Sequence, residues 1–175
     1  CLASAGAAHE LNFGNEASFT LKEFAELESC DVVILHGTNP LVTFPQAYAK
    51  LKRNTRAVKV VIDPIESDTV LDLRQSDPRS LHIRFEQGGD VLFNLAVARV
   101  ILENGWEDRA YLERVVEPAS LQEFRALCEQ ERCHPEAVAR QIALEADDPA
   151  ALLETIYRYA ALIAQPNEQG ERPRP

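Results

Sequence analysis

The stretch DVVILHGTNP, residues 31–40, decides the fold expected for this chain. A short apolar run rich in β-branched residues, bounded by turn residues, is typical of a strand buried on both faces of a sheet. Gly37 permits a turn that a Cβ would obstruct, and Asn39 tolerates left-handed backbone geometry. Pro40 disfavours a helical Asn39 and so separates the strand from the next element. We therefore expect a buried parallel strand at 31–35 that ends in a loop able to face a ligand.

The rest of the first half alternates between helical and strand-like patterns. Further strands are expected at 57–63 and 81–86 with a loop between them, and helices at 18–29, 44–54 and 90–105. In the last helix Asp90 is placed to cap the start, and Gly105 follows the end. Strands separated by helices predict a parallel sheet with right-handed crossovers. The fold class expected is α/β, a Rossmann-like, mainly parallel sheet with flanking helices and a helical C-terminal part.

The second half reads as four consecutive helices, at 106–116, 120–131, 135–146 and 148–165. Ser120 and Glu123 have the spacing of a capping box, and Asp148 followed by Pro149 is a typical helix start. We expect one domain over residues 1–164, cut from a larger multidomain protein. Residues 165–175 are polar and rich in proline, which predicts a linker or tail.

Composition excludes several classes of protein. The 175 residues are 46% apolar and 26% charged, as in a globular domain with a sizeable core, and the formal net charge is −10. That charge argues against nucleic acid or an anionic membrane as a partner, because both require clustered lysine and arginine. No apolar run is long enough to cross a membrane.

The four cysteines, Cys1, Cys30, Cys128 and Cys133, form no CxxC pair. A disulfide framework is not expected in a chain of this length and apolar content. Cys128 and Cys133 with His134 resemble part of a metal cluster, but a closed zinc site needs four ligands and no fourth lies nearby. Two cysteines on helix faces and an exposed histidine are the alternative that we favour.

Three successive strands end in residues that suit a ligand. These are Gly37, Thr38 and Asn39; Ile62, Asp63 and Pro64; and Gly88, Gly89 and Asp90. Each triplet alone is also compatible with an ordinary turn. Because the carboxyl ends of parallel strands meet at one edge of a sheet, where ligands of open α/β folds bind, the set predicts a nucleotide-like ligand there. The turn after Gly37 would add free backbone N–H groups for an anion. We expect His36 to be structural or exposed, with a cofactor contact as the alternative.

The ordered set C-x-A-S-A, D-x-x-x-x-x-G-x-N-P, V-I-D-P and G-x-D resembles the molybdopterin oxidoreductases of the dimethyl sulfoxide reductase superfamily. This superfamily includes nitrate reductases and formate dehydrogenases. The resemblance runs from Cys1 to about Ala164. It implies one α/β domain of a larger enzyme, binding guanosine and phosphates of a bis-molybdopterin guanine dinucleotide cofactor with molybdenum or tungsten.

The resemblance also implies roles for individual residues. It places Gly37, Thr38 and Asn39 in a cofactor loop, Ile62, Asp63 and Pro64 against the guanine nucleotide, and Gly88, Gly89 and Asp90 in a further cofactor loop. Cys1 matches the cysteine that coordinates the metal in nitrate-reductase-like members, a role suited to a soft, charged thiolate. The alternative for Cys1 is a buried thiol without a metal.

Some positions depart from the family pattern. Leu2 stands where formate dehydrogenases usually have histidine, which disfavours the formate activity. Ile65, Glu66 and Asp68 follow the Asp-Pro pair, where many members carry basic residues. A phosphate-facing arginine is therefore missing or supplied from elsewhere.

The expected partners and the alternatives follow from the same resemblance. An iron–sulfur cluster would lie before Cys1, because the chain itself has no cluster-like run of cysteines. The partners would be the remaining domains of the parent chain and an electron-transfer subunit. We expect a cytoplasmic parent, with the periplasm as the alternative.

Two other functions stay open: a non-catalytic relative such as the large iron–sulfur subunit of complex I, and an unrelated nucleotide-binding α/β protein. The chain lacks the G-x-G-x-x-G and Walker loops of common nucleotide-binding proteins.

Overall fold

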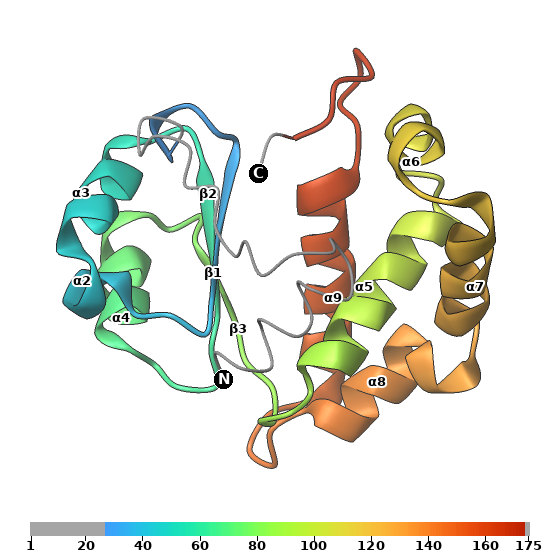
Figure 1. Ribbon diagram of the computed structural model, residues 1–175. Coiled ribbons are helices and arrows are strands. Elements are labelled where there is room, and N and C mark those ends of the chain that lie inside the picture. The colour runs from blue at the N-terminus through green and yellow to red at the C-terminus, as the bar shows by residue number, and fades with distance from the viewer. Residues whose placement is uncertain (1–26, 174–175) are drawn as a thin grey trace.

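The computed structural model describes residues 27–173 and shows an α/β fold (Figure 1). Its sheet has three strands in the order β1-β2-β3, and both pairings are parallel. The strands are β1 (Val32–His36), β2 (Val58–Ile62) and β3 (Leu81–Ile83). The predicted fold class is confirmed, and the first two strands lie within one residue of their expected limits. The expected helix at 18–29 lies almost entirely outside the described residues.

Helices cover both faces of the sheet (Figure 1). On one face lie α2 (Pro40–Thr43), α3 (Pro45–Arg53) and α4 (Asp68–Ser76); the other faces α5 (Asp90–Glu103), α8 (Pro135–Ile142) and α9 (Pro149–Ala164). Beyond α5 lie α6 (Arg109–Val115), α7 (Pro118–Cys128) and the short 3-10 helix η2 (Glu131–Cys133). None of the helices in the described part of the chain is long and apolar enough to span a membrane.

The central strand β2 joins two hydrophobic cores. Val60 and Ile62 belong to the larger core under α5, α8 and α9, whereas Val61 points into the smaller core under α3 and α4. This alternation follows from the two-residue period of a strand. Within the larger core the ring of Phe93 stacks on Phe85 and Tyr159, with centroid distances of 4.9 and 5.7 Å.

The prediction of a loop between the second and third strands is wrong, because this segment contains α4. The helix buries Val70 and Leu73 in the smaller core, with Thr69 beside them. Its sequence, DTVLDLRQS, offers only this short apolar face, so the helical period is weak. Packing against β2 therefore supplies most of the stability of this helix.

Several predicted element limits also differ from the structure. The third strand ends at Ile83 rather than 86, because Glu86 turns away and its N–H donates to Ile142 O. The capping box at Ser120 and Glu123 is wrong. Helix α7 begins at Pro118, where the fixed φ of proline suits the first helical position. The start of α9 is confirmed, since the Asp148 side chain accepts a hydrogen bond from the N–H of Ala150.

A buried lysine stabilises the amino-terminal end of the sheet. Lys59 on β2 is 2% exposed, and its Nζ donates to Asn54 O and to Asp77 Oδ2, the latter at 3.2 Å. Asp77 also pairs with Arg79 at 3.0 Å. The ammonium thereby ties together the ends of α3 and α4. A buried charge is tolerated only when it is paired and hydrogen-bonded, as it is here.

Replacing Lys59 with methionine tests this contact. The variant keeps an apolar side chain of similar length but leaves Asn54 O without its donor and removes one cation from Asp77. We expect the free energy of unfolding to fall by about 1–3 kcal/mol, measured by urea denaturation. Lys52→Met is the matched control, because Lys52 pairs with Asp72 at the surface and should change stability by less than about 1 kcal/mol. Equal losses in both variants would contradict the buried role.

Acid should weaken the same end of the molecule. The hydrogen bond from Arg79, with a smaller contribution from Lys59, lowers the pKa of Asp77 from its ordinary value of 3.8 to about 2. A folded-state pKa below the unfolded value stabilises the protein above pH 4, and this stabilisation is lost as the pH falls towards 2. The stability difference between the wild-type chain and Asp77→Asn should therefore narrow over that range. A difference that stays constant from pH 5 to pH 2 would rule this out.

Candidate functional site

The predicted ligand residues in the described part of the chain gather at the carboxyl-terminal edge of the sheet. Gly37 directly follows β1, and Asp63 directly follows β2. The loop of Gly88 and Gly89 follows β3 by a few residues and leads into α5. In Figure 1 the ends of the strands and the start of α5 lie together at the lower end of the sheet. The structure thus brings all three loops to one edge.

Gly37 and Gly88 form two turns that no side chain or backbone of the described residues covers. Their φ angles are +60° and +86°, in the left-handed region where a side chain is strained. A Cβ built on either residue would meet no heavy atom of residues 27–173 within 4 Å, apart from the glycine's own neighbours in the chain. The N–H of Gly37 donates to Ile62 O at 2.9 Å, which holds the first turn against the end of β2. The described part of the chain therefore leaves the backbone accessible at both turns.

Asn39 is fixed by α4. Its Oδ1 accepts hydrogen bonds from Thr69 Oγ1 at 2.6 Å and from Thr69 N at 3.3 Å. The N–H of Leu41 donates to the same Thr69 hydroxyl at 3.1 Å. The amide of Leu41, one of those expected to be free for an anion, is thus already engaged. Among the described residues no acceptor contacts Asn39 Nδ2, so this group is the part of Asn39 that can donate to a ligand.

Asp63 lies in a turn that orients its carboxylate. Its Oδ1 accepts from Ile65 N at 2.9 Å, and its backbone O accepts from His82 Nε2 at 2.8 Å. Burial lowers the pKa of His82, which favours the neutral imidazole. Because a carbonyl oxygen only accepts, Nε2 carries the donated proton. The side chain of His82 therefore positions the Asp63 backbone. The turn leaves Oδ2 as the Asp63 oxygen that can accept from a ligand.

Asp90 is not the cap of α5, contrary to the sequence-based expectation. Gly89 is the N-cap residue, and the Asp90 carboxylate instead pairs with His36 Nε2 at 2.8 Å. This contact joins the end of β1 to the start of α5 across 54 positions of sequence. It joins the residue before the first predicted loop to the last residue of the third.

Gly89 is a glycine for reasons of packing. A Cβ at this position would lie 3.0 Å from both Glu86 O and the Phe85 ring, and 3.1 Å from Ile142 Cβ. The close approach is therefore to this chain's own core, in contrast to the open space at Gly88. A ligand contact at Gly89 remains a prediction, as it does at every other residue of the three loops.

Sequence reasoning missed three polar groups at this edge. They are the Thr69 hydroxyl, the His36 imidazole as the partner of Asp90, and the Ser67 hydroxyl. Ser67 Oγ is buried and has no hydrogen-bond partner among the described residues. A helical assignment of 68–76 would have revealed Thr69, since it would have placed Ser67 and Thr69 at a helix start beside Asp63.

The predicted metal ligand, Cys1, lies outside the described residues. Within residues 27–173 no group of three or more histidine, cysteine or acidic side chains is arranged to hold a metal ion. Cys128 and Cys133 are buried free thiols, and burial raises the pKa of Cys128. His134 caps α8, its Nδ1 accepting from Glu136 N at 3.4 Å. The weak metal pattern at 128–134 therefore has a structural explanation.

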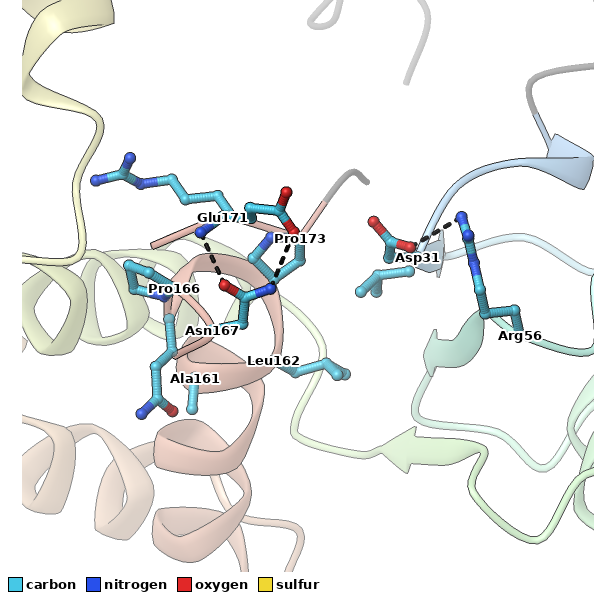
Figure 2. A pocket seen from close by; sticks show the side chains of 11 residues that line it. Asp31, Arg56, Ala161, Leu162, Pro166, Asn167, Glu171 and Pro173 are labelled. Atoms are coloured by element: carbon cyan, nitrogen blue, oxygen red, sulfur yellow. Dashed lines mark hydrogen bonds and ion pairs between the residues drawn. The ribbon is translucent and has the colours of Figure 1, made fainter. Parts of the chain in front are cut away.

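A cavity of about 850 Å³ lies at the opposite end of the sheet (Figure 2). One wall holds Asp31 and Arg56, which precede β1 and β2 and pair at 3.0 Å. The other holds the end of α9 and a turn in which the Asn167 side chain bonds Glu171. None of the predicted ligand residues in the described part of the chain lines this cavity. The size of a cavity therefore does not identify the candidate site.

Comparison with known proteins gives a distant similarity to a protein of known activity. No family model matches this chain. It is 28% identical over 87 residues to the iodate reductase subunit IdrA of Denitromonas iodatirespirans. The matched region covers 50% of this chain and 10% of that protein. This similarity indicates a distant relationship to a subunit of an oxidoreductase.

Substitutions at the glycines distinguish turn strain from packing. Gly37→Ala should lower the free energy of unfolding by about 1–2 kcal/mol through backbone strain, and Gly37→Asn should recover part of that loss. Gly89→Ala should cost about 1–3 kcal/mol through overpacking, and Gly89→Asn should cost more than Gly89→Ala. Chemical denaturation of the four variants checks the pattern. If the alanine and asparagine variants ranked in the same order of stability at both positions, this distinction between strain and packing would be refuted.

Proposed function

We propose that this chain is the cofactor-binding α/β domain of a molybdenum or tungsten oxidoreductase. In this proposal the carboxyl edge of the sheet binds guanosine and phosphates of a bis-molybdopterin guanine dinucleotide cofactor. The single observation that supports it best is the meeting of the three predicted loops at one edge, joined by the His36–Asp90 contact. The distant similarity to an iodate reductase subunit supports the oxidoreductase class.

The residues at the edge fit a nucleotide. No other part of residues 27–173 covers the turns at Gly37 and Gly88, where phosphates or ribose would approach the backbone. Asn39 Nδ2 is a donor, and the carboxylates of Asp63 and Asp90 are acceptors. The buried Ser67 Oγ without a partner adds a hydroxyl that a ligand or water could satisfy. Nucleotides present both donors and acceptors, and this edge offers the complement of each.

Cys1 is the proposed protein ligand of the metal. A thiolate suits a metal that the cofactor already holds through sulfur. When bound, the cofactor would supply the redox chemistry, in which the metal accepts or donates electrons at the substrate. The part of the chain described here would bind and orient the nucleotide end of the cofactor.

The proposal includes partners that this chain does not contain. The remaining domains of the parent protein would enclose the other half of the cofactor. Electrons would pass through an iron–sulfur cluster encoded before Cys1 and on to an electron-transfer subunit. The substrate would be selected by those other domains, so the similarity to an iodate reductase subunit does not extend to iodate as the substrate here.

The test uses the parent protein and its Cys1→Ala variant. We expect purified parent to contain molybdenum or tungsten, measured by mass spectrometry, and to release guanine nucleotide on acid treatment. The variant should retain the guanine nucleotide but show altered metal coordination by X-ray absorption. A parent with neither metal nor nucleotide, in a host that loads a known member of the superfamily, would exclude the proposal. The non-catalytic alternative would then be preferred.

A further inference from the structure

The contact between His36 and Asp90 does more than join two elements. The two side chains are 35% and 53% exposed, and a pair this exposed adds little to the stability of a fold. It nevertheless lies among the predicted ligand loops, since His36 precedes the Gly37 turn and Asp90 follows Gly89. A role in stabilising the core therefore does not account for it.

Backbone hydrogen bonds beside His36 and Asp90 fix the positions of both residues. His36 is the last residue of β1, and the next N–H, that of Gly37, is bonded to Ile62 O at 2.9 Å. Asp90 is the first residue of α5, which Gly89 begins by accepting a hydrogen bond from Phe93 N at 2.9 Å. Only the side-chain torsions of His36 and Asp90 lie between these two fixed backbone positions. The imidazole can therefore hold the carboxylate in one orientation.

The contact uses only one oxygen of Asp90. Because a carboxylate accepts hydrogen bonds, Nε2 of His36 donates to Oδ1. No described residue contacts Oδ2, which is left as an acceptor at the same edge as the open turns of Gly37 and Gly88. A carboxylate repels phosphate and accepts from N–H and O–H groups. Asp90 therefore suits the base or ribose of a nucleotide, and the open turns suit its phosphates.

We propose that His36 is a positioning residue that orients Asp90 to accept hydrogen bonds from the nucleoside part of the ligand. This inference rests on the proposed function, and it adds the residue that prepares the site and the part of the ligand that meets Asp90. His36 acts through Asp90 and does not itself contact the ligand.

The experiment measures binding of GDP to the full 175-residue chain by isothermal titration calorimetry. Asp90→Asn should weaken binding about tenfold, as expected for a lost hydrogen bond to a charged group. His36→Phe keeps the ring but removes the donor, and it should weaken binding by a similar factor. His36→Gln retains an N–H donor on a side chain of similar reach and should recover most of the affinity. The double variant His36→Phe/Asp90→Asn should bind no worse than Asp90→Asn alone.

Two controls separate this role from general disturbance of the chain. Glu103→Gln removes another ion pair of α5, that with Arg99 at 2.7 Å, at the opposite end of the helix. It should leave GDP affinity unchanged. Inorganic pyrophosphate is the phosphate-only probe. Its binding should not weaken in His36→Phe or Asp90→Asn, because neither change removes a phosphate contact.

The outcomes are distinguishable. If the wild-type chain binds GDP and His36→Phe binds equally well, the positioning role is overturned while nucleotide binding stands. Tighter binding by His36→Phe would show that His36 competes with the ligand, which also overturns it. Additive losses in the double variant would assign His36 an independent contact and overturn its action through Asp90. If the wild-type chain binds no GDP, this inference and the nucleotide-binding role both fail for this chain.

Discussion

The parallel pairing of β1 with β2 is the constraint on which the rest of this structure depends. Its register, from Val32 opposite Val58 to His36 opposite Ile62, ends both strands at the same level. Gly37 and Asp63 therefore emerge side by side. Because β2 is buried on both faces, its alternating side chains also determine where the two helical layers pack. A shift of one residue in this register would exchange the two faces and separate the loops.

The polar side chains at the two edges of the sheet differ in how many of their atoms make internal contacts. At the amino-terminal edge, Asp77 pairs with Lys59 and Arg79, and Lys59 also donates to a backbone carbonyl. The polar groups of these side chains are therefore used in internal contacts. At the carboxyl-terminal edge, Asn39, Asp63 and Asp90 each use one side-chain atom for internal contacts, and in the proposed function the other polar atom of each side chain would meet the ligand. Partial satisfaction of this kind preorganises a site, because the side chains are oriented before a ligand arrives.

Two neighbouring glycines at the carboxyl-terminal edge have different structural roles. Gly88 and Gly89 are neighbours in sequence, and either could have been read as a ligand contact. Gly88 has a left-handed backbone and faces open space, whereas Gly89 lies against Phe85 and Ile142 and has an ordinary φ of −74°. The first glycine allows the turn, and the second allows α5 to pack closely on α8.

The sequence by itself determined the parallel α/β fold, the first two strands, the helix start at Asp148 and the ligand-type residues at three strand ends. These features depend on hydrophobic period and on backbone preferences of glycine and proline, which act over a few neighbouring residues. Only the tertiary structure decided that residues 68–76 form a helix, since its apolar face is too short to be recognised without β2 to pack against. It also decided that Thr69 holds Asn39 and that His36 holds Asp90. Such pairings join segments 30 and 54 residues apart. They depend on how the crossovers return to the sheet edge, which no local pattern encodes.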